Sequence, residues 1–243
     1  MPASSLRGRL EISDDAHALA RRAAEWLTQT AAAASGIVRI SLSGGSTPKE
    51  LYTLLAEEPF VARIPWQRLE FFWGDERFVP HDDAASNYRM ANETLLSRVP
   101  IAGNRVHPVP VDGTPAEAAS RYETLLKHIY GADRLDPERP LFHIMLLGLG
   151  GDGHTASLIP GQSVLEEREH WVAAVGQGRP EQRITLTYPA IESSATIAFL
   201  VSGAEKASAV SAARAGDQRL PAARIVPQGD VIWFVDRAAS RQP

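Results

Sequence analysis

Residues 142–148 read FHIMLLG, and this stretch is apolar almost throughout instead of alternating between apolar and polar side chains. A strand without alternation is buried on both of its faces, as happens in a parallel sheet that helices cover from both sides. Two further runs share this pattern, IVRISL at 37–42 and TIAFLV at 196–201. The sequence therefore predicts an α/β fold built on a mostly parallel sheet.

Helical segments lie between the expected strands, so the order of elements alternates. Helices are predicted at 16–34 with Ser13 or Asp14 as N-cap, from Pro48 with Thr47 as N-cap, at 87–98, at 115–130, near 154–158 and at 205–216. Further strands are predicted at 69–73, 106–110, 171–175, 183–188 and 230–236. This alternation predicts a doubly wound, Rossmann-like sheet flanked by helices. No repeat or linker interrupts it, so we expect one domain over residues 1–243.

Composition excludes several classes of protein. The 243 residues include 29 acidic and 25 basic side chains, a net charge of −4, which argues against a nucleic-acid partner. A small anion needs only a local patch of cations and is compatible with this charge. The chain has no cysteine, which excludes a disulfide scaffold, a thiolate metal site and a cysteine nucleophile. We expect a cytoplasmic protein without a signal peptide or membrane partner, and the sequence fits a monomer and a homodimer equally.

The loops that follow parallel strands meet at one edge of the sheet, where ligands of such folds bind. The first of these loops contains Ser43, Gly44, Gly45, Ser46 and Thr47 and leads into a helix. Glycines let the backbone approach a ligand closely, and the free N–H groups of a helix N-terminus attract anions. The spacing is not that of a Walker A loop. By itself, the loop fits a phosphate site and a simple strand-to-helix turn about equally.

The second loop follows FHIMLL and contains a histidine, the titratable side chain of most interest in the chain. Gly148, Gly150 and Gly153 match the GxGxxG dinucleotide pattern, but no acidic residue ends the next expected strand, which argues against a nicotinamide site. His154 comes next, and an imidazole of ordinary pKa, about 6.5, suits a general base at neutral pH. Asp152 can fix its tautomer or only support the loop, as Gly150 and Gly153 are expected to do. The alternative is a turn histidine without a catalytic role.

Charged side chains at other strand ends complete the candidate site. Asp75, Glu76 and Arg77 follow the strand at 69–73. They form either a surface ion-pair cluster or a group in which Arg77 holds an oxyanion or substrate hydroxyls. In that second interpretation Asp75 orients Arg77 or the histidine. Arg183 and Lys206 stand at element boundaries and suit a phosphate, although an isolated cation is more often simply solvated. No spacing of His, Asp and Glu indicates a metal site.

Five stretches taken together carry a family resemblance. They are LSGGSTPKELY (42–52), FFWGDERFVPHDDAASNYRMANETLL (71–96), LLGLGGDGHTASLIPG (146–161), RITLTYPAI (183–191) and VSGAEKA (201–207). In this order they resemble the 6-phosphogluconolactonases of the glucosamine-6-phosphate isomerase/6-phosphogluconolactonase family.

The resemblance implies a sugar-phosphate isomerase type of fold and an enzyme of the oxidative pentose phosphate pathway. It implies hydrolysis of 6-phospho-D-glucono-1,5-lactone to 6-phosphogluconate without a metal or organic cofactor. His154 is similar to the family's catalytic base, and Asp75 and Arg77 resemble its acid–arginine pair. The loop at 43–47, Arg183 and Lys206 resemble its phosphate anchors.

Two alternatives differ in class. A glucosamine-6-phosphate deaminase/isomerase is similar in fold, but that family is expected to carry Tyr after its Asp-Glu pair and Asn-Glu after its DGH segment. Here Arg77 and Ser157-Leu158 stand at these places, which favours the lactonase. A non-catalytic sugar-phosphate sensor usually carries a helix-turn-helix segment, and no such segment fits this sequence.

Overall fold

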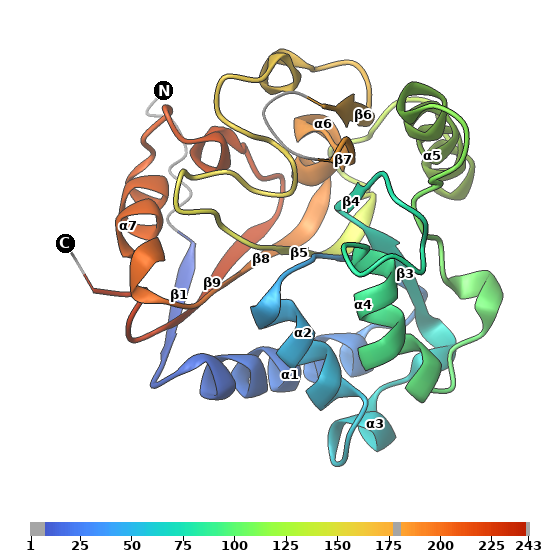
Figure 1. Ribbon diagram of the computed structural model, residues 1–243. Coiled ribbons are helices and arrows are strands. Elements are labelled where there is room, and N and C mark those ends of the chain that lie inside the picture. Colours follow the sequence, from blue (N-terminus) through green and yellow to red (C-terminus); the bar gives the residue numbers. More distant parts are fainter. Residues whose placement is uncertain (1–7, 177–180, 242–243) are drawn as a thin grey trace.

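A parallel sheet runs through the middle of the molecule (Figure 1), seen in a computed structural model that describes residues 8–176 and 181–241. Its six strands lie in the order β1-β9-β8-β5-β2-β3, and every neighbouring pair is parallel. The strands are β1 (Arg9–Ser13), β2 (Val38–Leu42), β3 (Leu69–Trp73), β5 (Phe142–Leu147), β8 (Ser194–Val201) and β9 (Asp230–Asp236). The apolar run that predicted the sheet forms β5, inside it.

Helices cover both faces of this sheet. They are α1 (Ala16–Ala33), α2 (Ser46–Leu55), α3 (Phe60–Arg63), α4 (Asn87–Thr94), α5 (Pro115–Tyr130), α6 (Tyr188–Glu192) and α7 (Ala207–Ala215). In Figure 1, α1 and α2 lie below the sheet and α5 and α6 lie above it. The predicted doubly wound α/β fold is confirmed. No helix in the described part of the chain is long and apolar enough to cross a membrane.

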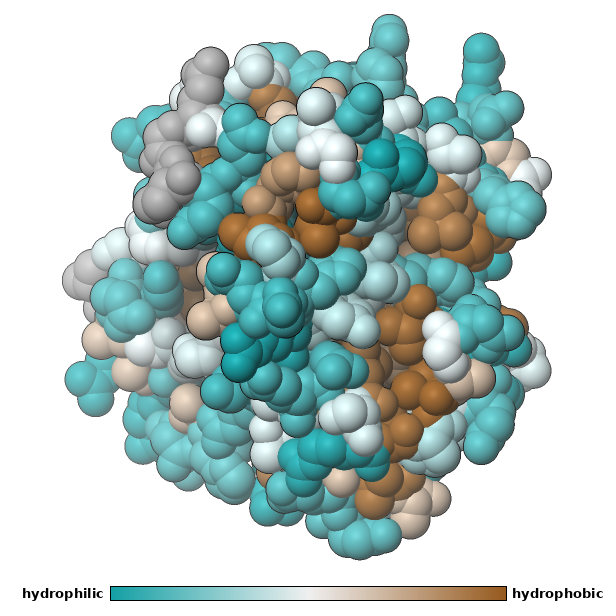
Figure 2. Space-filling view, turned by 45° about the vertical axis from the view of Figure 1, so that its right-hand side comes forward, coloured by the Kyte–Doolittle hydropathy of each residue, from teal (hydrophilic) through white to brown (hydrophobic). Residues whose placement is uncertain are grey.

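The hydrophobic core lies between these layers. In β5, Ile144, Met145 and Leu146 are fully buried. His143 is half-buried, and its Nδ1 accepts a hydrogen bond from the backbone N–H of Arg39 at 3.0 Å, so it has a structural partner. Most of the face shown in Figure 2 is hydrophilic, with separate hydrophobic patches.

A second, antiparallel sheet was not predicted. It contains β4 (Asp75–Arg77), β7 (Arg183–Leu186) and β6 (Val172–Val175) in the order β4-β7-β6. Gly74 connects the two sheets, because its N–H donates to Leu42 O at 2.9 Å while its C=O accepts from Leu186 N at 2.8 Å. The chain therefore leaves the large sheet at Gly74 and enters the small one with its next three residues.

Both predicted N-caps on the first two helices are wrong. Asp15, not Ser13 or Asp14, caps α1, and its carboxylate accepts from Ala18 N at 2.8 Å. Helix α2 begins at Ser46 after Gly45, and the Thr47 hydroxyl does not cap it. That hydroxyl instead hydrogen-bonds the Ser202 hydroxyl at 2.8 Å, in the loop after β8.

Two predicted elements are absent from the described structure. Residues 154–158 form a turn, in which Thr155 Oγ1 donates to Gly148 O at 2.8 Å and folds the chain back on the preceding loop. Residues 106–110 make a single bridge, from Val106 to Phe71. Pro108 and Pro110 lack the N–H groups that a longer ladder requires.

Candidate active site

A cavity of about 360 Å³ opens where the loops after β2, β5 and β8 meet. This edge of the sheet is the one that the topology predicts for a ligand. The predicted site residues that line the cavity are Ser43, Gly44, Gly45, Ser46, Thr47, Asp75, Arg77, Gly150, His154, Arg183 and Lys206. Asp152 and Gly153 do not line it, and they contribute through the loop that carries His154.

The loop at 43–47 is held from behind by a tyrosine of α2. The Tyr52 hydroxyl accepts from Ser43 N and donates to Ser43 O, both at 2.9 Å. Burial raises the pKa of Tyr52, so the hydroxyl stays protonated and makes both bonds. Gly45 has φ 107°, a backbone conformation that favours glycine. The loop is therefore fixed in place at the start of α2.

The short pairing of β4 with β7 brings three of the predicted charges together. Asp75 lies opposite Thr185, and Arg77 lies opposite Arg183. Side chains two residues apart on a strand share a face, so these four residues belong to one face of the ribbon. Asp75, Arg77 and Arg183 line the cavity from that face.

The structure changes the expected pairing of Asp75. Its Oδ2 accepts from Ser157 Oγ at 2.7 Å and lies 3.9 Å from Arg183 Nη1. Arg77 Nη1 instead donates to the backbone oxygen of Ala85 at 2.6 Å. The carboxylate of Asp75 is thus paired with Arg183, because the Arg77 guanidinium hydrogen-bonds the segment that precedes α4.

His154 is oriented by the aspartate two residues before it. Its Nδ1 lies 2.5 Å from Asp152 Oδ1, and the same oxygen accepts from His154 N at 3.1 Å. A carboxylate partner requires Nδ1 to carry the proton, which leaves Nε2 as the basic nitrogen. Gly150 N donates to His154 O at 2.8 Å, and Gly153 N donates to Gly150 O at 3.0 Å. These hydrogen bonds hold the loop that carries His154 in one conformation.

Sequence reasoning missed several residues of the site. Asn87 lines the cavity and donates from Nδ2 to Asp75 O at 2.9 Å. Just before it, Ser86 caps α4 and accepts from Arg89 N at 3.1 Å. Ser202 and Glu205 also line the cavity. Their place in the loop that carries Lys206 was the signal that could have identified them.

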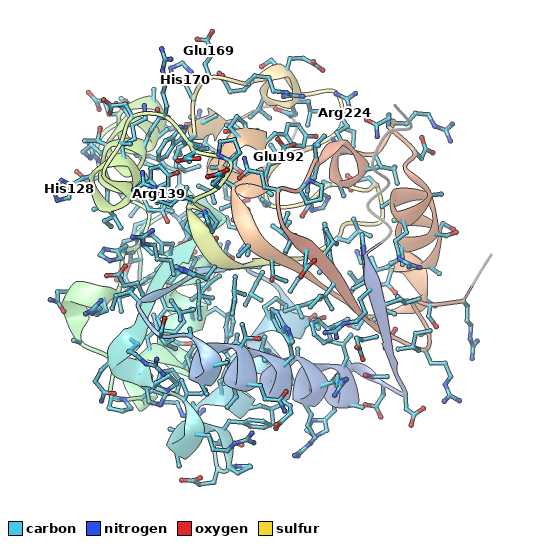
Figure 3. The ribbon with its side chains drawn as sticks, turned by 180° about the vertical axis from the view of Figure 1, so that it is seen from behind. His128, Arg139, Glu169, His170, Glu192 and Arg224 are labelled. Carbon is cyan, nitrogen blue, oxygen red and sulfur yellow. The ribbon has the colours of Figure 1, made fainter. Side chains whose placement is uncertain are left out.

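Titratable side chains outside the cavity form pairs but no metal site in the part of the chain that the structure describes. Within residues 8–176 and 181–241, no group of three or more His, Asp and Glu side chains is arranged to hold a metal ion. His170 pairs with Glu167, Nδ1 to Oε2 at 3.2 Å, and Figure 3 shows it near Glu169 at the outer edge of the molecule. His170 does not line the cavity.

Comparison with known proteins places the chain in a family. Residues 14–233 match the family described as glucosamine-6-phosphate isomerases/6-phosphogluconolactonase. A 6-phosphogluconolactonase of Nostoc is 37% identical in an alignment 244 residues long, which covers 98% of this chain and 99% of the relative. The chloroplastic 6-phosphogluconolactonase 3 of Arabidopsis thaliana is 40% identical over 212 residues, and the match covers 84% of this chain and 65% of that longer protein.

Solved structures agree with the sequence matches. The 6-phosphogluconolactonase from Trypanosoma cruzi superimposes with a TM-score of 0.85 and 30% identity, over 99% of this chain and 98% of that one. The agreement extends over both sheets and the helices around them, since almost the whole chain is covered. The chain belongs to the glucosamine-6-phosphate isomerase/6-phosphogluconolactonase family.

Proposed function

We propose that the protein hydrolyses 6-phospho-D-glucono-1,5-lactone to 6-phosphogluconate, in the oxidative pentose phosphate pathway. One observation carries this proposal: His154, oriented by Asp152, opens into the same cavity as Arg77, Arg183 and Lys206. A base beside several cations fits an ester that carries a phosphate. The relatives named 6-phosphogluconolactonase support the same activity.

In the proposed reaction His154 acts first as a base and then as an acid. Its Nε2 removes a proton from a water molecule as the water oxygen attacks the lactone carbonyl carbon. The carbonyl oxygen becomes an oxyanion, for which Arg77 supplies positive charge. When the intermediate collapses, the bond between the carbonyl carbon and the ring oxygen breaks, and the imidazolium gives its proton to that oxygen. Asp152 stabilises the imidazolium between these steps.

The other cations hold the phosphate away from the reacting carbon. The 43–47 loop at the start of α2 supplies backbone and hydroxyl groups, and Arg183 and Lys206 supply charge. Binding energy from this remote group positions the carbonyl against the water and His154.

Arg183→Ala and Lys206→Ala are each expected to raise KM for the phosphorylated lactone by about 10-fold, since each removes a charge-assisted contact. With unphosphorylated gluconolactone the effect is expected to be much smaller. Steady-state kinetics on both substrates measures this difference. Arg63→Ala is the control, because Arg63 pairs with Glu25 outside the cavity. Equal damage on both substrates would contradict a phosphate role.

The activity itself is tested on freshly generated 6-phosphogluconolactone against its spontaneous hydrolysis. We expect clear acceleration, and no ammonia from glucosamine 6-phosphate under matched conditions. A deaminase moves a proton between neighbouring carbons and needs an extra carboxylate beside its histidine. After His154 come Thr155, Ala156, Ser157 and Leu158, which offer none. Ammonia without lactone opening would favour the deaminase, and binding without either reaction would favour a sensor.

We further infer a cytoplasmic location, no nucleic-acid or membrane partner, and a single domain over residues 1–243. The net charge of −4 supports the absence of a nucleic-acid partner. The hydrogen bonds of Gly74 to both sheets support one domain. The name of the Arabidopsis relative assigns that protein to the chloroplast.

A further inference from the structure

Glu76 lies between two residues of the cavity but belongs to the opposite face of β4. Its side chain is buried and accepts four hydrogen bonds. Oε1 accepts from the backbone N–H groups of Arg77 at 2.8 Å and Asn87 at 2.7 Å. Oε2 accepts from the N–H of Tyr88 at 2.7 Å and from the hydroxyl of Ser86 at 3.0 Å. One carboxylate therefore joins β4 to the first turn of α4.

The chemistry of these partners requires a carboxylate. Three of the four donors are backbone amides, which cannot accept, and they occupy both oxygens of Glu76. A glutamine at this place would point its NH₂ group at least at one N–H. Burial raises the pKa of Glu76 on balance, although its four hydrogen bonds favour the charged form and lower the pKa in part. The position at the N-terminus of α4 also favours a negative charge.

The two residues whose backbone N–H groups donate to Glu76 Oε1 also belong to the cavity. Arg77 and Asn87 both line it. Asn87 donates to Asp75 O at 2.9 Å, and its Oδ1 packs so closely on Gly44 that a Cβ added there would lie 2.1 Å away. Asn87 thus touches both the segment that carries Arg77 and the loop assigned to the phosphate.

We propose that Glu76 is a positioning residue of the lactonase, which sets Arg77 and Asn87 in the cavity through their backbone N–H groups. The inference rests on the proposed function and adds a residue that touches no substrate. It differs from a general role in stability, because most of its effect on kcat must pass through Arg77, the residue assigned to the oxyanion.

Glu76→Gln is expected to lower kcat by about 10-fold on both the phosphorylated and the unphosphorylated lactone, since a misplaced Arg77 stabilises the oxyanion less well. Glu192→Gln is the matched control. Glu192 is a half-buried carboxylate of α6 (Figure 3) that accepts from Val226 N at 2.8 Å, and burial raises its pKa too. The kcat of the Glu192→Gln variant should stay within about 2-fold of that of the unmodified protein. Thermal unfolding of both variants sets an assay temperature at which each is folded.

A double-mutant cycle separates positioning from stability. In the Arg77→Ala background, Glu76→Gln should lower kcat by about 3-fold or less, because the guanidinium that it positions is gone. If Glu76→Gln fails to fold, Ser86→Ala is used instead, because it removes one of the four donors. It should lower kcat by about 3-fold, and by less than that in the Arg77→Ala background.

Three outcomes can be told apart. The positioning role is overturned if Glu76→Gln lowers kcat by the same factor with and without Arg77→Ala. It is also overturned if Glu76→Gln and Glu192→Gln lower kcat equally. Wild-type kcat in Glu76→Gln overturns it as well. If the unmodified protein does not accelerate lactone opening, the proposed function itself has failed, and this shows before any variant is measured.

Discussion

His154→Ala is expected to lower kcat for 6-phosphogluconolactone by about 100-fold or more, the usual contribution of general acid–base catalysis. The variant lacks the group that removes the proton from water and later returns it to the ring oxygen. KM should change little, because the phosphate anchors remain. The fold should survive, since the His154 side chain is 28% exposed and pairs with Asp152 in its own loop. Initial rates and thermal unfolding of the same preparation measure both effects.

The matched control is His170→Ala. Like His154, His170 pairs through Nδ1 with a nearby carboxylate, that of Glu167, but it lies outside the cavity. Its loss should leave kcat within about 2-fold, as for most surface substitutions. A His154→Ala variant that keeps near wild-type kcat would show that this histidine is structural and that the mechanism is wrong.

The part of the fold that the sequence predicts well is the part fixed by burial. IVRISL, FHIMLLG and TIAFLV lie inside the large sheet as β2, β5 and β8, because only strands covered on both faces tolerate such apolar runs. Once these strands are parallel, their C-terminal loops must meet at one edge. This is why residues as distant in sequence as Ser43, His154 and Lys206 were predicted together and do line one cavity.

Tertiary contacts decided what the sequence could not predict. Strand β4 has three residues, too few for a periodic pattern, and its pairing with β7 depends on Gly74. Residues 154–158 do not form a helix because Thr155 hydrogen-bonds back to Gly148. Glu76 was seen only as one of three neighbouring charges, since nothing in the spacing shows that its carboxylate faces α4. In each case a contact that the local sequence pattern does not show overrides the local preference.

The second large effect is expected at a glycine beside the proposed base. Gly150 has a backbone conformation that alanine also adopts, so the backbone permits Gly150→Ala. A Cβ there would lie 2.1 Å from His154 Nδ1 and 2.2 Å from Cε1, so the imidazole must move. A displacement of about 1 Å at a catalytic group can cost about 100-fold in rate. We expect kcat to fall by about that factor, and the overpacked loop to lower the free energy of unfolding by about 1–3 kcal/mol.

The neighbouring glycine provides the control for this prediction. A Cβ on Gly151 would meet its nearest atom, Glu205 O, at 3.5 Å, an ordinary van der Waals contact, so Gly151→Ala should keep kcat within about 2-fold. If Gly150→Ala acts by moving the imidazole, it should cost little more when combined with His154→Ala, because no ring is left to displace. A loss that multiplies fully in the double variant, or an equal loss in Gly151→Ala, would mean that the loop itself, and not the position of His154, limits the reaction.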